Sequence, residues 1–192
     1  NKTGSHSQYL FIRKDFLVPI KSVSLRYCFL EPLSVVIHAV NRLKIFNKKI
    51  LISGHGNIGK LLESVLKLYG IKYDIYDPNS QKNMFEQFDV VFECSGDSIS
   101  LNKYLEYPGI TIIALGFDYN PIVIGHLVSS EINILTSLGA SMEDFNNAVQ
   151  IIDLIDLPRQ IVYNMEYFSS IVNNYGVGII LDHKAVFDPW KE

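Results

Sequence analysis

Cysteine is scarce in this chain of 192 residues, which contains only Cys28 and Cys94. The two cysteines lie far apart in the sequence, and each is inside an apolar segment. This spacing argues against a disulfide framework and against a CxxC metal or redox pair, and it favours a reducing compartment. We therefore expect two buried thiols without a chemical role.

Long hydrophobic runs and clusters of basic residues are also absent. Glu31, Pro32 and His38 interrupt the most apolar stretch, so no segment approaches the ~20 apolar residues of a membrane-spanning helix. The chain has 17 Lys and Arg against 20 Asp and Glu, and its basic residues are scattered. We therefore expect neither a nucleic-acid nor a membrane partner. Because no basic-then-apolar signal peptide begins the chain, we expect a cytoplasmic protein.

An initiator methionine is missing as well, and the residues that follow Asn1 are typical of the middle of a domain. We interpret this start as the boundary of a processed or partial chain. With 48% apolar residues, the chain can bury a full core. We expect one large domain, or one domain with a fragment of another.

What the sequence does contain is an alternation of apolar and amphipathic segments. Apolar runs typical of strands occupy residues 48–53, 71–77, 88–94, 110–117 and 132–137. Helical patterns occupy residues 31–46, 58–69 and 141–155, the last with a capping-box-like start in which Ser141 precedes Asp144. Strands that are apolar throughout and alternate with helices indicate an α/β fold with a parallel sheet covered on both faces.

The two ends of the chain carry weaker patterns. Residues 8–12 and 16–20 are typical of short strands, residues 165–173 of a helix and residues 177–183 of a strand.

A glycine-rich loop follows the first apolar run. Gly54, Gly56 and Gly59 form a GxGxxG pattern between a predicted strand and a predicted helix. The first glycine allows the tight turn, the second lets the backbone approach a pyrophosphate, and the third lets the helix pack close to the strand. The N–H groups of Asn57 and Ile58, at the start of the helix, would face the phosphates. We expect a dinucleotide site here, with His55 as a surface residue without a chemical role.

Asp77 ends the next predicted strand, about 20 residues after the last glycine of the loop. The dinucleotide fingerprint places an acid there to accept hydrogen bonds from the adenosine ribose, and a carboxylate repels the 2′-phosphate of NADP. The sequence thus predicts NAD as the cofactor. The alternative is a strand-to-helix turn that binds nothing.

Three further segments accompany the loop: EPLSVVIHAV at residues 31–40, FDVVFECSG at residues 88–96 and SSEINILTSLGASMEDFNNAVQIID at residues 129–153. In this order and at these spacings they resemble the zinc-containing medium-chain alcohol dehydrogenases, within them the polyol and threonine dehydrogenase branch. The resemblance covers most of the chain. It implies a doubly wound Rossmann domain for NAD at residues 43–157. Residues 1–42, which include a linker helix, and residues 158–192 would be partial remnants of a GroES-like catalytic domain.

The resemblance also implies roles for individual residues. Asp77 and Lys82 would hold the adenosine ribose, and Ser95 and Gly96 would lie beside the adenosine. The residues near the nicotinamide would be Leu115, Gly116 and Phe117, with Val35 under its ring.

The activity implied by the resemblance is a zinc-dependent hydride transfer between a secondary alcohol or polyol and NAD. Glu31 would lie at the zinc as an occasional or water-bridged ligand, or it would only cap the helix begun by Pro32. A catalytic zinc needs three protein ligands, and the family's Cys and His ligands belong to an N-terminal domain. No arrangement of Cys28 with four of the five histidines, His6, His38, His126 and His183, restores the ligand spacing. We therefore expect zinc only together with such a domain, and no catalytic residue within this chain.

Two other functions stay open. An NAD-sensing module without catalysis would use the same loop and acid. A zinc-free quinone or enoyl reductase of the same superfamily would prefer NADPH, against which Asp77 argues. A homodimer or tetramer is also open, with residues 134–137 and the apolar run 121–128 as a candidate edge.

Overall fold

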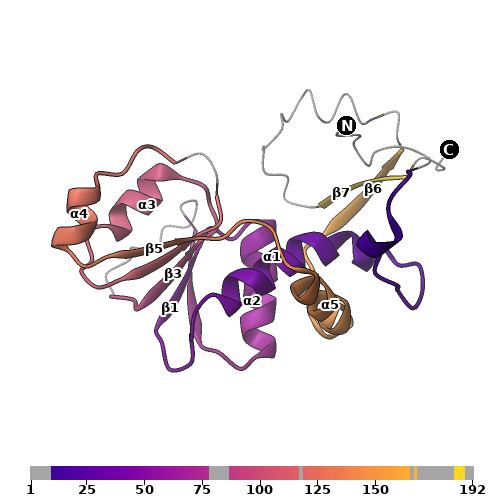
Figure 1. The fold of residues 1–192 in the computed structure, drawn as a ribbon, viewed down its shortest axis with the longest axis horizontal. Coiled ribbons are helices and arrows are strands. Elements are labelled where there is room, and N and C mark those ends of the chain that lie inside the picture. The colour runs from indigo at the N-terminus through magenta and orange to yellow at the C-terminus, as the bar shows by residue number, and fades with distance from the viewer. Residues whose placement is uncertain (1–9, 78–86, 117–118, 165–166, 168–183, 189–192) are drawn as a thin grey trace.

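The computed structural model describes residues 10–77, 87–116, 119–164, 167 and 184–188. Its centre is a five-stranded parallel sheet in the order β2-β1-β3-β4-β5 (Figure 1). The strands are β1 (Ile50–Ser53), β2 (Tyr73–Tyr76), β3 (Val90–Glu93), β4 (Thr111–Ala114) and β5 (Asn133–Thr136). The expected α/β class with a parallel Rossmann-type sheet is confirmed.

Both faces of the sheet are buried at its centre. β1 and β3 are buried along their whole length, and successive side chains of a strand point to opposite faces. Ile50 and Ile52 therefore enter one apolar cluster, whereas Leu51 enters the other. This explains why the strands are continuous apolar runs rather than alternating ones.

Two groups of helices cover the two faces (Figure 1). One face packs against α1 (Leu30–Asn41), α2 (Asn57–Leu68) and α5 (Met142–Ile151), and α1 contacts both of the other two helices. The opposite face packs against α3 (Ser98–Tyr104) and α4 (Ile124–Ser129). Three short 3-10 helices, η1 (Lys14–Phe16), η2 (Leu25–Phe29) and η3 (Ile152–Leu154), complete the described helical structure. Among the described helices, none is long and apolar enough to cross a membrane.

Two helix boundaries follow from local sequence. The Ser141 hydroxyl accepts a hydrogen bond from the Asp144 N–H at 3.1 Å, and the Asp144 carboxylate accepts one from the Ser141 N–H at 3.0 Å. This is the expected capping box at the start of α5. Helix α2 ends at Leu68, and Gly70 then takes a φ of +67°, which glycine adopts without strain.

Three expectations from the sequence are wrong. Residues 10–13 and 17–20 are irregular and flank η1, and no described strand pairs with them, so strands there would leave backbone groups unpaired. Helix α1 begins at Leu30 rather than at Pro32 because η2 runs directly into it. Cys28 is exposed rather than buried, because η2 turns the next residue, Phe29, into the core instead.

A second, smaller sheet follows the Rossmann-type core. It pairs β6 (Gln160–Asn164) with β7 (Lys184–Asp188) in parallel. The helix expected at 165–173, apart from residue 167, and the strand expected at 177–183 lie outside the described residues. The division at residues 42/43 and 157/158 stays a prediction.

Candidate dinucleotide-binding site

The predicted loop lies where the strand order of the sheet reverses. β1 pairs with β2 on one side and with β3 on the other, so the connections that leave β1 and β3 diverge at their carboxyl ends. Doubly wound sheets bind ligands in the crevice formed at such a switch point. The chain leaves β1 at Gly54, turns through the loop and begins α2 at Asn57. Gly56 precedes α2 and has no side chain to cap it, so the first N–H groups of the helix suit an anion.

Two of the loop glycines are in contact with backbone that leaves no room for a side chain. Gly54 has a φ of +88°, and a Cβ atom there would lie 2.8 Å from the Cα of Ser95. A Cβ atom at Gly59 would lie 2.0 Å from the carbonyl oxygen of Gly54. The structure therefore brings Ser95, which was expected beside the adenosine, directly against the first glycine of the loop.

A second pair of glycines meets at the ends of β3 and β4. A Cβ atom at Gly116 would lie 2.5 Å from the Cα of Gly96 and 2.6 Å from the hydroxyl of Tyr119. Gly96 itself has a φ of +69°. Four residues predicted to touch the cofactor thus lie together at the carboxyl ends of neighbouring strands: Gly54, Ser95, Gly96 and Gly116.

Glu93, the last residue of β3, hydrogen-bonds to several groups at these carboxyl ends of the strands. Its carboxylate is fully buried and accepts hydrogen bonds from the backbone N–H groups of Ser95, at 2.9 Å, and Gly96, at 3.1 Å. It also accepts hydrogen bonds from the hydroxyls of Ser95 and Tyr119. The Tyr119 hydroxyl in turn accepts a hydrogen bond from the Gly116 N–H at 3.1 Å. Glu93 therefore positions both turns that face the predicted cofactor.

Sequence reasoning missed this network. The FECSG segment was noted for its resemblance to a known family, but the role of its glutamate, Glu93, was not. A partner such as Tyr119 lies 26 residues further along the chain, so the residues around Glu93 give no sign of it. Two further members lie deeper: the Tyr104 hydroxyl donates to Ser53 Oγ at 2.7 Å, and Ser53 Oγ lies 3.5 Å from Glu93.

Burial raises the pKa of both Tyr104 and Tyr119, and Glu93 raises the pKa of Tyr119 further. Both phenols therefore stay protonated at physiological pH.

The remaining predicted cofactor residues are placed as follows. Asp77 directly follows β2, and Leu115 follows β4 and is half-buried. Val35 lies on α1 and is half-buried. Lys82 and Phe117 lie outside the described residues. Their roles stay predictions.

The loop residue His55 has a definite partner. Its Nε2 atom lies 2.7 Å from the Glu63 carboxylate on α2, and the Tyr73 hydroxyl of β2 donates to the same carboxylate at 3.1 Å. Burial, followed by Glu63, raises the pKa of Tyr73. The loop, α2 and β2 are thereby linked through three side chains.

Glu31, the predicted zinc residue, is exposed in the first turn of α1. Its carbonyl oxygen accepts a hydrogen bond from the Ser34 hydroxyl at 2.7 Å. In the part of the chain that the structure describes, no three His, Cys, Asp or Glu side chains are grouped so that they could hold a metal ion. The described residues therefore do not fit a catalytic zinc, which needs three protein ligands.

A separate polar cluster joins α1 to α5. The buried Asp144 carboxylate lies 2.9 Å from His38 Nδ1 and accepts a hydrogen bond from Asn41 Nδ2 at 3.1 Å. Burial alone would raise the pKa of Asp144, but the hydrogen bonds from Ser141, His38 and Asn41 outweigh burial and lower it. The ionised carboxylate is therefore the form that the fold favours.

Replacement of Asp144 by asparagine is expected to lower the free energy of unfolding by about 2 kcal/mol at pH 7, because charge-assisted hydrogen bonds are lost. Since the pKa is lower in the folded state, this stabilisation is complete above the unfolded value of about 3.9 and is lost as the pH falls through the folded pKa. Urea unfolding of both proteins from pH 7 to pH 2 measures the difference. It should shrink below about pH 4, whereas the exposed control Glu106→Gln should show little effect. A difference independent of pH would contradict the prediction.

Comparison with known proteins gives structural matches only. No family model matches the sequence, and no curated protein matches it either. L-idonate 5-dehydrogenase from Escherichia coli has a TM-score of 0.72 at 24% identity, over 88% of this chain and 59% of that one. Acetophenone reductase from Geotrichum candidum, in complex with NAD, has a TM-score of 0.73 at 15% identity; the match covers 88% of this chain and 57% of that one. S. aureus TarJ, in complex with NADPH, has a TM-score of 0.66 at 19% identity; the match covers 89% of this chain and 66% of that one.

The chain thus spans less than two thirds of the length of these three proteins. At such identities the matches establish the fold. The expected likeness to alcohol and polyol dehydrogenases is confirmed at that level.

Proposed function

We propose that this chain is the NAD(H)-binding portion of an alcohol or polyol dehydrogenase. The observation that carries the proposal is the loop from Gly54 to Gly59, which lies at the switch point of a parallel sheet with Asp77 at the end of the neighbouring strand. At Gly54, Gly59 and Gly116 an added Cβ atom would lie within 3.0 Å of the protein's own backbone, so the loop, α2 and the turns after β3 and β4 pack closely against one another. Tight turning and close packing of helix on strand are the roles that the first and third glycines have in a dinucleotide-binding loop.

The residues of this chain would act by binding and orienting. The first N–H groups of α2 would hold the pyrophosphate, and Asp77 would accept hydrogen bonds from the adenosine ribose. Glu93 would position the Ser95–Gly96 turn beside the adenosine without touching the cofactor. The nicotinamide would supply hydride-transfer chemistry for the carbinol carbon of the substrate. Fixed geometry between ring and substrate is the contribution of the protein to that step.

Zinc dependence is part of the proposal only if a catalytic domain supplies the metal ligands. The resemblance assigns the metal ligands to a catalytic domain, and Glu31 is the single candidate ligand on the described residues. The described residues do not supply a zinc site, so we assign no step to the metal. The alcohol or polyol substrate rests on the resemblance and on the structural neighbours.

Cofactor choice is the direct test of this function. We expect calorimetry to give at least about tenfold tighter binding of NAD⁺ than of NADP⁺, because a carboxylate at Asp77 repels a 2′-phosphate. Asp77→Ala should weaken NAD⁺ binding about tenfold and reduce the discrimination between the two nucleotides. The exposed control Glu106→Ala should change neither affinity.

Other outcomes would favour the alternatives. A clear preference for NADP⁺ would contradict the role of Asp77 and favour a zinc-free quinone or enoyl reductase. Tight NAD⁺ binding without turnover of any alcohol by the natural protein would favour a nucleotide-sensing module. Absence of binding to either nucleotide would overturn the proposal.

A further inference from the structure

The loop between β1 and α2 has a single side chain by which it can be fixed. β1 ends at Ser53 and α2 begins at Asn57. Between them lie Gly54, His55 and Gly56, of which only His55 has a side chain. Glycine loses more conformational freedom on ordering than any other residue. A ligand that binds this loop therefore has to supply the free energy of ordering it, unless the protein orders the loop beforehand.

The side chain of His55 is held on α2. Its Nε2 atom lies 2.7 Å from the carboxylate of Glu63, and the two side chains are 29% and 32% exposed. Because both are partly shielded from water, their contact is stronger than one between fully exposed groups. The loop is therefore tied to a point well inside the helix that follows it.

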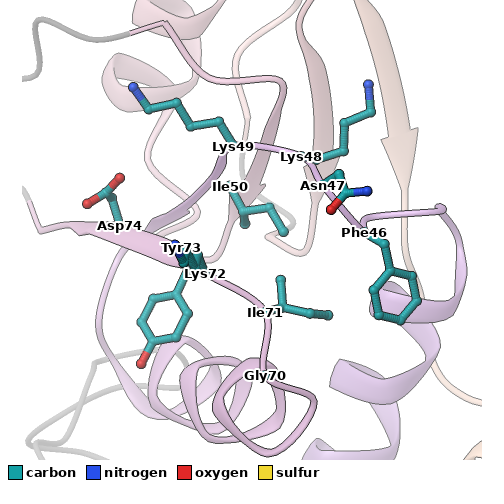
Figure 2. Close-up of a pocket in the computed structure, with 10 residues that line it drawn as sticks. All are labelled: Phe46, Asn47, Lys48, Lys49, Ile50, Gly70, Ile71, Lys72, Tyr73 and Asp74. Atoms are coloured by element: carbon teal, nitrogen blue, oxygen red, sulfur yellow. The ribbon is translucent and has the colours of Figure 1, made fainter.

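Glu63 is in turn held from β2. The Tyr73 hydroxyl donates to the other oxygen of the Glu63 carboxylate at 3.1 Å. Figure 2 shows the Tyr73 ring extending from β2 toward the helix that ends before Gly70, which is α2. An ionised carboxylate only accepts hydrogen bonds, so His55 Nε2 is the donor in its contact with Glu63. We call these three side chains the Tyr73–Glu63–His55 network.

Glu63 makes these contacts in place of the pair that its own helix offers. Lys67 follows Glu63 by four residues on α2, which is the spacing at which Glu and Lys stabilise an isolated helix. Lys67 Nζ instead lies 3.4 Å from the Asp156 carboxylate. Glu63 is therefore directed to the loop and to β2 rather than along α2.

We propose that His55 is a positioning residue of the dinucleotide-binding loop, an inference that rests on the proposed function. Held by Glu63, the imidazole orders the loop before the cofactor binds, so that the first N–H groups of α2 are already in place for the pyrophosphate. His55 acts through the backbone of its two glycine neighbours and needs no contact with the cofactor. The gain in affinity is the ordering entropy that the cofactor does not have to supply.

The test compares two replacements of His55 by calorimetry with NAD⁺ on the full 192-residue chain. The side-chain nitrogen of glutamine can occupy the place of Nε2, whereas that of asparagine reaches only the place of Nδ1. We therefore expect His55→Asn to raise the dissociation constant about tenfold, and His55→Gln to leave it within about threefold of the wild-type value. ADP-ribose carries the same pyrophosphate, so it should lose affinity by the same factor as NAD⁺.

Glu63→Ala gives an independent measurement of the same contact. It should raise the dissociation constant of NAD⁺ as much as His55→Asn does. The double variant should bind no more weakly than either single variant, because both substitutions remove one contact. Tyr73→Phe leaves the contact between Glu63 and His55 in place, so it should have a smaller effect, which should disappear in the presence of His55→Asn.

Matched controls are His126→Asn on α4 and Glu106→Ala after α3, both at exposed positions, and neither should change the affinity for NAD⁺. Thermal unfolding verifies that each variant is folded at the temperature of the titration. Wild-type affinity in His55→Asn, equal losses in His55→Asn and His55→Gln, or additive losses in the double variant would each overturn the proposal. A wild-type chain that binds neither NAD⁺ nor ADP-ribose would instead overturn the proposed function itself.

Discussion

Gly59→Ala is expected to destabilise the protein by at least about 3 kcal/mol and to abolish dinucleotide binding. A Cβ atom at Gly59 would lie 2.0 Å from the Gly54 carbonyl oxygen, and its other near neighbours are the Gly54 carbonyl carbon and the Ile52 side chain. Because the obstacle is backbone, it cannot rotate away, and α2 has to move from β1. For a chain of this size the melting temperature should fall by roughly 10 °C.

The chain offers a matched control for this substitution. Gly125 lies in α4 with an ordinary backbone conformation, and a Cβ atom there would meet nothing within 4 Å. Gly125→Ala should be neutral or stabilise the protein by up to about 1 kcal/mol, because alanine favours helix. Thermal unfolding and NAD⁺ calorimetry on both variants make the comparison. Equal effects of the two substitutions would contradict the close contact between α2 and the loop.

Glu93→Gln is expected to cost about 2–3 kcal/mol of stability and to weaken nucleotide binding, although the two side chains have nearly the same shape. Both carboxylate oxygens accept hydrogen bonds, one from the Ser95 N–H and the other from the Gly96 N–H. A glutamine has only one acceptor oxygen, so its NH₂ group must face one of these backbone donors. Hydroxyl groups can rotate to accept instead, but backbone N–H groups cannot.

The measurement pairs urea unfolding with NAD⁺ titration. Glu106→Gln, on the exposed end that follows α3, removes the same charge without any buried partner and should leave both quantities unchanged. Glu93→Gln should lower the unfolding midpoint and also reduce NAD⁺ affinity, because the Ser95–Gly96 turn loses its support. Normal stability together with normal affinity would show that Glu93 does not position this turn.

The parts of the site that could be predicted are those whose geometry is set by residues close in the sequence. The loop from Gly54 to Gly59 needs only a strand, three glycines and a helix start, all within one short segment. The capping box of Ser141 and Asp144 is equally local. In both cases the interactions that define the conformation are made between residues only a few positions apart. The structure has both conformations where they were expected.

The failures at the N-terminal end have the opposite cause. Residues 16–20 have the composition of a strand, but a strand requires a neighbour to satisfy its backbone, and no described strand lies beside them. Cys28 lies in an apolar segment, yet η2 turns Phe29 inward and leaves the thiol exposed. The composition of a segment shows which conformations it can take, whereas the neighbouring elements determine which conformation it has and which side chains are buried.

Local sequence was thus sufficient for the α/β class, the glycine-rich turn between β1 and α2, and the capping box of α5, because these depend on periodicity and on contacts within a few residues. Tertiary structure alone decided which strand ends meet, and with them the network of Glu93, Ser53, Tyr104 and Tyr119. It also decided that His38 binds Asp144 and that β2 lies at an edge of the sheet. Those features join residues from different elements, and their energies depend on distances that only the packed chain defines.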